Sequence, residues 1–321
     1  MTRDHPGLAV VGAGNWGRNL MRTIEISLAC RLVAVVSRNP QTAAMVGPDC
    51  SVVASYGQLF TQVSVDGILI ATPTPTHVDL AKLSIERGIP VLVEKPLALT
   101  VASADALATA ADAYGVFADV DYIHLFNDAY RMLKQRVAEG GPIEHIESIG
   151  GSMGPYRQDT SPLWDYGSHD IAMCCDIMSE DPKIVSGRFL RQKVNEDGIS
   201  AVFELALTYP SGVTAIIECG NAMPDKIRQF NVTTRDVILR FDDLSFSTLT
   251  ETNRKTGDSK VIMTKNEIGH PLGQRIQDFC VNLGRGTVNP SPLWFSVSVT
   301  SILAALEESI LTETQVHLDG T

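Results

Sequence analysis

Two motifs place ionisable side chains in settings that suit proton transfer. Lys95 stands in Glu94-Lys95-Pro96 at the end of an apolar run, and a lysine ammonium can stabilise a developing alkoxide. Asp165 lies four residues before His169, so on a helix the carboxylate and the imidazole share a face. An imidazole titrates near neutral pH and can accept a proton from a hydroxyl group. The alternative for Asp165 is a helix cap beside an incidental histidine.

A glycine-rich loop near the N-terminus suits the binding of a phosphate. Gly12-Ala13-Gly14-Asn15-Trp16-Gly17 fits G-x-G-x-x-G, directly after the apolar run Leu8–Val11 and directly before a helical pattern. The first glycine allows a tight turn, the second lets a pyrophosphate approach the backbone, and the third allows the helix to pack closely on the strand. We therefore expect this loop to bind a dinucleotide. The expected contacts are Gly12, Gly14, Asn15, Trp16 and Gly17.

The end of the second apolar run bears on the choice of cofactor. Many NAD-binding proteins have an Asp or Glu there, whereas this chain has Ser37-Arg38-Asn39. A guanidinium can pair with a 2'-phosphate, and no carboxylate is there to repel it. The residues Ser37 and Arg38 therefore favour NADP over NAD, with an ordinary surface arginine as the alternative.

Further polar residues follow apolar runs at the same expected edge of a sheet. One group lies in Ala71-Thr72-Pro73-Thr74-Pro75-Thr76-His77, and the other is Glu94-Lys95-Pro96. Ligands of open α/β sheets bind beyond the carboxyl ends of the strands. Thr76 equally suits a helix cap, and His77 also suits a packing or capping role. The expected cofactor contacts here are Thr72, Pro73, Thr74, His77, Glu94, Lys95 and Pro96.

The first part of the chain alternates short apolar runs with helical patterns, which predicts a doubly wound parallel α/β sheet, a Rossmann domain over residues 1–122. The expected strands are Leu8–Val11, Leu32–Val36, Gly67–Ala71, Val91–Glu94 and Val116–Tyr122. The expected crossover helices are Trp16–Ser27, His77–Gly88 and Val101–Tyr114.

After about Tyr122 the pattern changes to alternating runs typical of an open, mainly antiparallel sheet, so an α+β substrate and oligomerisation domain is expected over 123–321. A helix is expected at Ala129–Glu139, and a hairpin turn at Pro210-Ser211-Gly212. The expected strands are Ile184–Val194, Ala201–Tyr209, Val213–Cys219, Gln229–Phe241 and Leu244–Thr250. Closing helices are expected at Gln274–Leu283 and Val297–Leu311, the last of them packing back on the first domain.

Bulk properties exclude several classes of function. A chain of 321 residues suits two domains, and its net charge of −11 disfavours nucleic acid and anionic membranes. We expect a small-molecule substrate as the partner. The six cysteines show no C-x-x-C spacing, and no further ligand cluster supports a metal at Asp165, His169 and Asp170. With no signal or membrane-spanning pattern, a cytoplasmic protein is expected.

Together, Gly12-x-Gly14-x-x-Gly17, Ala71 to His77, Glu94-Lys95-Pro96 and Asp165-x-Gly167-x-His169 resemble the motifs of the glucose-fructose oxidoreductase, inositol dehydrogenase and rhizopine-catabolism (Gfo/Idh/MocA) family over nearly the whole chain. The resemblance implies a Rossmann domain, an open antiparallel sheet and a catalytic set of Lys95, Asp165 and His169. It also implies a cis Lys95-Pro96 bond and substrates among sugars, cyclitols, sugar nucleotides and related carbonyl compounds.

The chain departs from the common family pattern in two segments that bear on substrate contacts. His124-Leu125-Phe126-Asn127 stands where Arg-Phe-Asn is frequent, and Ser161-Pro162-Leu163-Trp164 replaces a frequent glycine pair. The sequence around Trp164 resembles the branch that oxidises UDP-linked amino sugars. An arginine can meet a diphosphate and aromatic rings can stack on a sugar or base, although each can also be an ordinary surface or packing residue. The expected substrate contacts are Tyr122, His124, Arg157 and Trp164, with Tyr156 a weaker candidate.

The expected reaction is oxidation of a secondary alcohol, in which His169 accepts the proton, Lys95 stabilises the alkoxide and NADP or NAD takes the hydride. One alternative is a carbonyl or tetrapyrrole reductase similar to dihydrodiol dehydrogenase or biliverdin reductase. The other is a non-catalytic dinucleotide-binding regulator, which the intact catalytic set disfavours. Helices on one face of the second sheet would leave the other face for a homodimer or homotetramer.

Overall fold

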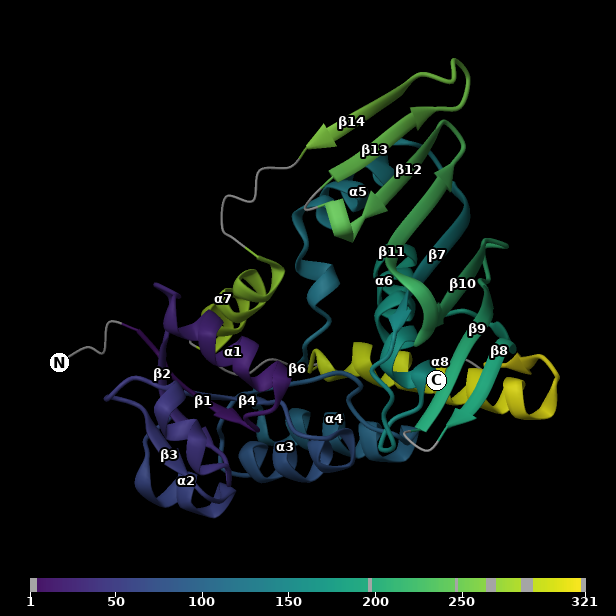
Figure 1. Cartoon of the computed structure of the whole chain (residues 1–321). Coiled ribbons are helices and arrows are strands. Elements are labelled where there is room, and N and C mark those ends of the chain that lie inside the picture. Colours follow the sequence, from purple (N-terminus) through teal and green to yellow (C-terminus); the bar gives the residue numbers. More distant parts are fainter. Residues whose placement is uncertain (1–4, 196–197, 246–247, 264–269, 284–290, 319–321) are drawn as a thin grey trace. The chain divides into compact units, whose positions relative to one another are not determined.

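The computed structural model describes residues 5–195, 198–245, 248–263, 270–283 and 291–318 (Figure 1). The chain divides into two compact units. The first comprises residues 1–121 and 268–297, and the second comprises residues 122–267 and 298–321.

The first unit contains a six-stranded sheet in the order β3-β2-β1-β4-β5-β6, and all of its strand pairs are parallel. This is the doubly wound arrangement expected of a Rossmann domain, and the prediction is confirmed. The strands are β1 (Gly7–Val11), β2 (Arg31–Val36), β3 (Ser51–Val53), β4 (Gly67–Ile70), β5 (Val91–Val93) and β6 (Ala118–Val120).

Helices cover both faces of this sheet, which is why its central strands are continuous apolar runs rather than alternating ones. Helices α1 and α7 lie together on one face, and α3 and α4 lie together on the other (Figure 1). Phe279 of α7 packs against Phe117, with the ring centroids 5.9 Å apart. The Phe279 ring also lies close to Gly67, where a Cβ would come within 2.8 Å of it. The helices of this unit are α1 (Asn15–Glu25), α2 (Tyr56–Gln62), α3 (His77–Ile85), α4 (Val101–Tyr114) and α7 (Pro271–Leu283).

The second unit contains a nine-stranded mixed sheet in the order β14-β13-β12-β11-β7-β10-β9-β8-β15. Its strand pairs are antiparallel except for the parallel pair β7–β10. A mainly antiparallel sheet is thus confirmed. The strands are β7 (Ile143–Met153), β8 (Ile184–Asn195), β9 (Gly198–Thr208), β10 (Thr214–Gly220), β11 (Ala222–Thr234), β12 (Val237–Asp242), β13 (Thr248–Asn253), β14 (Ser259–Met263) and β15 (Val316–His317).

Two turns explain how the sequence divides these strands. The predicted hairpin at residues 210–212 joins β9 to β10, where Gly212 has a φ of +87° and donates to the carbonyl of Tyr209. The predicted single strand Gln229–Phe241 is wrong, because β11 and β12 are separate and antiparallel. The hydroxyl of Thr234 accepts from the N–H of Val237 and donates to its carbonyl, which closes this turn. Of the predicted run Leu244–Thr250, residues 246 and 247 lie outside the described residues.

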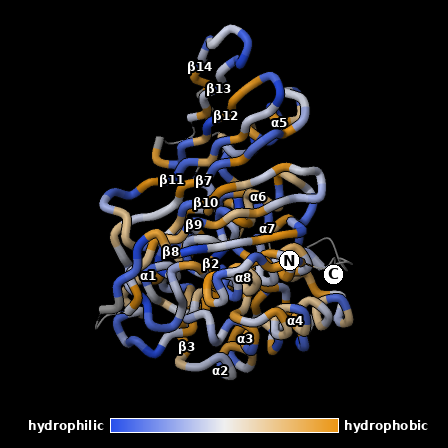
Figure 2. Tube along the Cα trace, turned by 90° about the vertical axis from the view of Figure 1, so that its right-hand side faces the viewer, coloured by the Kyte–Doolittle hydropathy of each residue, from blue (hydrophilic) through white to orange (hydrophobic). Residues whose placement is uncertain are grey.

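Helices pack on one face of the second sheet. Tyr130 of α5 (Asp128–Glu139) meets the rings of Phe230 and Phe241, which face each other across β11 and β12. Ser148 of β7 lies opposite Phe230, and its hydroxyl donates to Asp170 of α6 (Ser168–Met178). Buried residues alternate with more exposed ones over residues 230–234 of β11 and 239–242 of β12, and hydrophobic and hydrophilic segments follow one another in this part of the sheet (Figure 2). This alternation matches a sheet with one covered face and one open face.

Helix α8 (Leu293–Thr312) is the only described helix long and apolar enough to cross a membrane by composition, with a mean hydropathy of 1.3. Half of its most apolar window is nevertheless buried within the protein. Ser309 on this helix accepts from the N–H of Gly187, and Glu307 accepts from the indole of Trp164. These contacts identify α8 as a core helix of a folded unit.

Candidate functional site

The glycine loop connects β1 to α1 through two very close backbone approaches. Gly12 has a φ of +98°, and a Cβ there would lie 2.5 Å from the carbonyl oxygen of Ala71. A Cβ on Gly17 would lie 1.8 Å from the carbonyl oxygen of Gly12. Neither position therefore tolerates a side chain. Helix α1 begins at Asn15, with Gly14 at the N-cap and no side-chain cap, so its first N–H groups remain directed outwards.

Two features of the loop suit the binding of a dinucleotide. A Cβ on Gly14 would meet nothing within 4 Å, so the backbone at this exposed position can be approached closely by a ligand. The indole N–H of Trp16 is buried and has no acceptor among the described residues, so it can donate to a bound phosphate or ribose oxygen. Uncapped N–H groups at a helix N-terminus bind anions such as a pyrophosphate. Gly12, Gly14, Asn15, Trp16 and Gly17 thus form one loop that can hold the phosphates of a dinucleotide.

Ser37 and Arg38 follow β2 directly and differ in their surroundings. The hydroxyl of Ser37 lies 2.8 Å from that of Thr42 and accepts from the N–H of Asn39 at 3.1 Å, so it fixes the turn. Arg38 is exposed, and no carboxylate of the described residues forms an ion pair with it. Its guanidinium can accordingly meet an anionic group of a ligand.

The segment after β4 is held together by its own side chains. The hydroxyl of Thr76 donates to the carbonyl of Pro73 at 2.7 Å and meets the hydroxyl of Thr72 at 2.7 Å. Thr76 occupies the N-cap position of α3 without a side-chain cap bond. Thr74 is buried. Thr72 and Pro73 are thus positioned at the carboxyl end of β4, where α/β sheets bind ligands.

His77 joins this segment to the one that carries Lys95. It is only 1% exposed, with Nδ1 2.9 Å from the carbonyl oxygen of Pro96 and Nε2 2.8 Å from that of Thr72. Carbonyl oxygens only accept hydrogen bonds, so the two contacts together are satisfied fully by a ring protonated at both nitrogens. His77 therefore connects the segment after β4 with the segment after β5.

Lys95 follows β5 at the same sheet edge as the glycine loop. It is half-buried, between the buried residues Glu94 and Pro96. The Lys95-Pro96 bond is cis, which confirms the expectation from the family resemblance. The Lys95 side chain is thus partly exposed at the end of β5. The carboxyl of Glu94 lies inside the first unit, in contact with Asp121.

In the second unit, His169 lies in the first turn of α6 and is 8% exposed. Its ring meets that of His124 edge to face, with the centroids 4.6 Å apart. Arg228 donates from its guanidinium to Nε2 of His124 at 3.0 Å. A guanidinium cannot accept, so Nε2 of His124 carries no proton and that ring is neutral. Its Nδ1 lies 3.7 Å from Oδ2 of Asp243, and the other carboxylate oxygen, Oδ1, accepts from the side-chain amide of Asn127 at 2.9 Å.

Asp165 lies in a π-helical turn, Leu163–Gly167, immediately before α6. One of its carboxylate oxygens accepts from Nε of Arg157 at 3.1 Å. The sequence predicted a regular helix through Asp165 and His169, whereas the helix changes type between them. Two predicted site residues, Arg157 and Asp165, are therefore brought together as an ion pair.

The remaining predicted substrate residues are buried to different degrees. Trp164 is 3% exposed and donates from its indole to Glu307 of α8 at 3.1 Å. Tyr122 is also 3% exposed. Tyr156 is half-buried, and its hydroxyl donates to the sulfur of Met153. The structure thus draws the Trp164 and Tyr122 side chains into the protein interior.

Three residues near His169 were not among the predicted catalytic or substrate residues. Arg228 and Asp243 hold His124, and Asp170, which the sequence offered only as a metal ligand, is 5% exposed beside His169 in α6. Burial raises the pKa of Asp170 to about 6, although the Ser148 hydroxyl and Arg228 oppose the rise. Asp170 adjoins the predicted motif and could have been found there. Arg228 and Asp243 carried no signal, because only the pairing of β11 and the fold of the loop after β12 bring them to His124.

Comparison with known proteins agrees with this geometry. The family model described as an oxidoreductase family with an NAD-binding Rossmann fold matches residues 7–122, and the Gfo/Idh/MocA C-terminal domain model matches residues 130–239. A crystal structure of a protein assigned as an oxidoreductase from Magnetospirillum magnetotacticum MS-1 is 34% identical, with a TM-score of 0.85 over 94% of this chain and 99% of that one.

Two curated relatives have named activities. The scyllo-inositol 2-dehydrogenase (NADP(+)) IolW of Bacillus subtilis is 25% identical over 59% of this chain and 55% of its own length. The UDP-N-acetylglucosamine 3-dehydrogenase of Acidithiobacillus ferrooxidans is 24% identical over 75% of each chain. The match to the first thus spans about half of that relative's length. With both domain models matched and a full-length structural relative, the chain belongs to the Gfo/Idh/MocA family of oxidoreductases.

Proposed function

We propose that this protein is a nicotinamide-dependent oxidoreductase that interconverts a secondary alcohol and the corresponding ketone of a carbohydrate-type substrate. The observation that carries the proposal is the glycine loop, where Gly14 leaves the backbone open in front of the uncapped start of α1. Such a helix start recognises the pyrophosphate of a dinucleotide. Lys95 follows β5, which is separated from β1 by the single strand β4, and it supplies from the same sheet edge the cation that the reaction needs.

The proposed roles use three side chains. Lys95 donates a hydrogen bond to the substrate oxygen and stabilises its developing negative charge. His169 takes the hydroxyl proton during oxidation and returns it during reduction. Asp165 holds the segment that leads into α6 through its ion pair with Arg157. The bound nicotinamide supplies the hydride acceptor or donor.

We propose NADP as the preferred cofactor. The exposed guanidinium of Arg38 and the hydroxyl of Ser37 stand where a carboxylate would otherwise disfavour a 2'-phosphate. Among the relatives, IolW is named as an NADP(+)-dependent enzyme, which agrees with this choice.

For the substrate, we propose a sugar nucleotide in preference to a free cyclitol. Two arginines of the second unit support this choice, since Arg157 is half exposed and Arg228 bonds to His124 beside His169. Guanidinium groups pair well with the oxygens of a diphosphate. The named activity of the Acidithiobacillus relative belongs to the same substrate class.

We further propose that the protein is cytoplasmic and forms a homodimer or homotetramer through the open face of its second sheet. Ile149, Ile216 and Ala206 are only partly buried on that face, next to Glu218 and Glu204 of neighbouring strands. A symmetric partner could cover such a mixed apolar and polar surface. Light scattering at micromolar concentration tests this, and a monomeric mass would contradict it.

A turnover screen tests the proposed function. Purified protein is incubated with NADP or NAD and pooled sugars, cyclitols or nucleotide sugars, and the absorbance of the reduced nicotinamide is followed. We expect turnover that falls at least about a hundredfold in Lys95→Ala, with the affinity for the cofactor retained. Turnover with dihydrodiols or tetrapyrroles alone would favour a reductase of another substrate class. Cofactor binding without any turnover would favour a regulator.

A further inference from the structure

Glu94 and Asp121 occupy equivalent positions at the ends of two neighbouring strands. Strands β5 and β6 are parallel, with Val93 opposite Val120, so the next residue of each strand lies at the same level. The N–H of Asp121 donates to the carbonyl of Val93 at 2.8 Å, which extends the pairing beyond the strand. Adjacent strands are about 4.8 Å apart, and the two carboxyl groups lie in hydrogen-bonding contact.

This contact joins two acids in the interior of the first unit. Glu94 is 9% exposed and Asp121 is 1% exposed. Neither oxygen of Asp121, nor Oε1 of Glu94, accepts a hydrogen bond from an N–H or hydroxyl donor of the described residues. An ionised carboxylate has only acceptor atoms, so a hydrogen bond between the two groups requires a proton on one of them.

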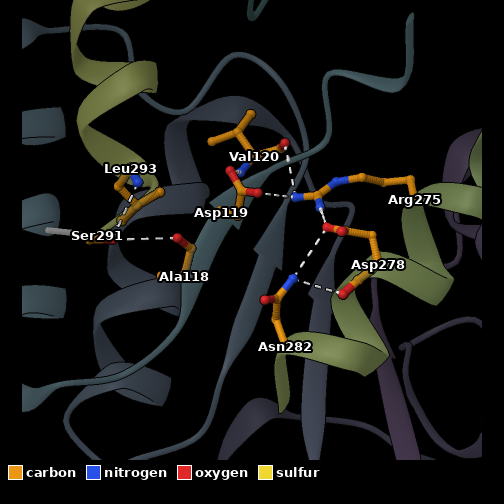
Figure 3. A network of polar contacts seen from close by, with 8 residues as sticks. All are labelled: Ala118, Asp119, Val120, Arg275, Asp278, Asn282, Ser291 and Leu293. Carbon is orange, nitrogen blue, oxygen red and sulfur yellow. Dashed lines mark hydrogen bonds and ion pairs between the residues drawn. The ribbon is translucent and has the colours of Figure 1, made fainter. Parts of the chain in front are cut away.

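The charges around the pair come from three elements. Lys95 acts from the end of β5, Asp119 from β6 and Arg275 from α7. Arg275 is completely buried and forms ion pairs with Asp119 at 2.6 Å and Asp278 at 3.0 Å (Figure 3). It also donates to the carbonyl of Val120. Arg275 is thus paired with two carboxylates and also acts on Asp121, whereas Lys95 acts on both acids of the pair.

Electrostatics agrees with a retained proton. Burial raises the pKa of Glu94 well above its ordinary value, and the adjacent carboxyl of Asp121 raises it further, while Lys95 opposes the rise. Burial also raises the pKa of Asp121 to about 6, against the opposing effects of Arg275, Glu94 and Lys95. Two carboxylates in contact cannot readily both ionise, because each charge disfavours the other.

We propose that Glu94 and Asp121 hold one proton between them and together act as positioning residues that give Lys95 a single negative counter-charge. The backbone N–H of Lys95 donates to the Glu94 carboxyl, which ties the pair to the segment that carries the ammonium. The consequence for Lys95 rests on its proposed catalytic role, whereas the shared proton does not. One negative charge attracts the Lys95 ammonium electrostatically and helps to hold it in place as a hydrogen-bond donor, whereas a neutral pair would not do so.

Infrared spectroscopy tests the shared proton without any turnover. At about pH 8 most acids are ionised, so a protonated carboxyl band in the wild-type protein has few sources. We expect such a band in the wild type, its loss in Asp121→Asn and in Glu94→Gln, and its retention in Asp105→Asn, which alters an exposed acid of α4. A wild-type protein without the band, or a band that both amide variants retain, would overturn the proposal.

A comparison of kcat with the KM for the cofactor tests the effect on Lys95. Asp121→Asn keeps one charge on Glu94, whereas Glu94→Gln combined with Asp121→Asn removes the counter-charge. We expect the double variant to lower kcat by about tenfold or more while the KM for the cofactor hardly changes, and we expect the single variant to lower kcat much less. We also expect Asp121→Ala to lower kcat/KM and Asp121→Asn to restore most of it. An unchanged kcat in a folded double variant contradicts the counter-charge, even where the infrared result supports a shared proton.

Discussion

His124 and His169 meet edge to face, with ring centroids 4.6 Å apart and planes at 79°. The Arg228 guanidinium fixes His124 as a neutral ring with a lone pair at Nε2. His124 is thus committed to Arg228, which leaves His169 as the better candidate for proton transfer.

The two histidines should therefore differ in their effect on turnover. We expect His169→Gln to lower kcat by about a hundredfold or more, because it removes the base. His124→Phe keeps an aromatic ring against His169. It should lower kcat by only about tenfold, because the guanidinium of Arg228 loses its hydrogen-bond acceptor on His124. Steady-state kinetics of both variants, with cofactor affinity as a folding control, measures the difference. A larger loss in His124→Phe would assign the proton transfer to His124.

The ion pair between Arg157 and Asp165 yields a prediction about substrate class. If Arg157 meets a diphosphate, Arg157→Ala should raise the KM for UDP-linked amino sugars by about tenfold or more and leave the KM for inositols nearly unchanged. Arg191→Ala, which removes an exposed arginine of β8, is the matched control. If free cyclitols are the better substrates and Arg157→Ala has no effect, the sugar-nucleotide proposal fails and the oxidoreductase proposal remains.

Arg38 should set the choice between the two nicotinamide cofactors. Loss of a charge-assisted contact to the 2'-phosphate should weaken NADP binding by about tenfold to a hundredfold in Arg38→Ala. Binding of NAD should hardly change. Calorimetric titration of both cofactors measures this, with Arg31→Ala at the other end of β2 as the control. Equal affinities for NADP and NAD in the wild type would contradict the proposed preference.

Asp170 should make the stability of the protein decrease as the pH rises, because the pKa of its carboxyl is raised in the folded state. Burial moves the pKa of its carboxyl from 3.8 to about 6, a shift that corresponds to about 3 kcal/mol. The folded state binds this proton more tightly, so the contribution is complete below about pH 4 and is lost as the pH rises through about 6.

Asp170→Asn removes this titration and keeps an acceptor for the Ser148 hydroxyl. The melting temperature of the wild type, relative to that of the variant, should fall between about pH 4 and about pH 7. Calorimetric scans at several pH values measure this difference in melting temperature. Asp105→Asn, the control, should keep the pH dependence of the wild type. A wild-type advantage that grows with pH would show that Asp170 is stabilised in its ionised form.

The sequence predicted the first unit well because its information is local. Apolar runs, the glycine spacing and the residues after each strand identify the sheet and the edge that carries Lys95. Strand β3 was missed because it has only three residues, Ser51–Val53, too few for a pattern. The contact between Glu94 and Asp121 could not be predicted, because it depends on the register of β5 and β6.

The second unit was predicted less completely because its contacts are long-range. Strand β7 was missed, since Glu144, Glu147 and the glycines at 150 and 151 weaken its apolar pattern, although it pairs with both β10 and β11. The sequence showed the motif around His169 through the four-residue spacing of Asp165 and His169. It did not show the π-helical turn before α6. It also did not show the partners of His124, because these residues lie far from His124 in the chain.

Isotope transfer measures the proposed hydride transfer directly. The protein is incubated with NADPH that carries deuterium at nicotinamide C4, in each of the two stereochemical forms. Oxidised sugars, cyclitols and nucleotide sugars serve as substrates, and mass spectrometry measures the deuterium content of the products. We predict that one labelled form delivers deuterium to the carbinol carbon of the product, and that Lys95→Ala slows this transfer strongly. Deuterium that stays on the cofactor with every substrate class, while NADPH binds normally, would contradict hydride transfer by this protein.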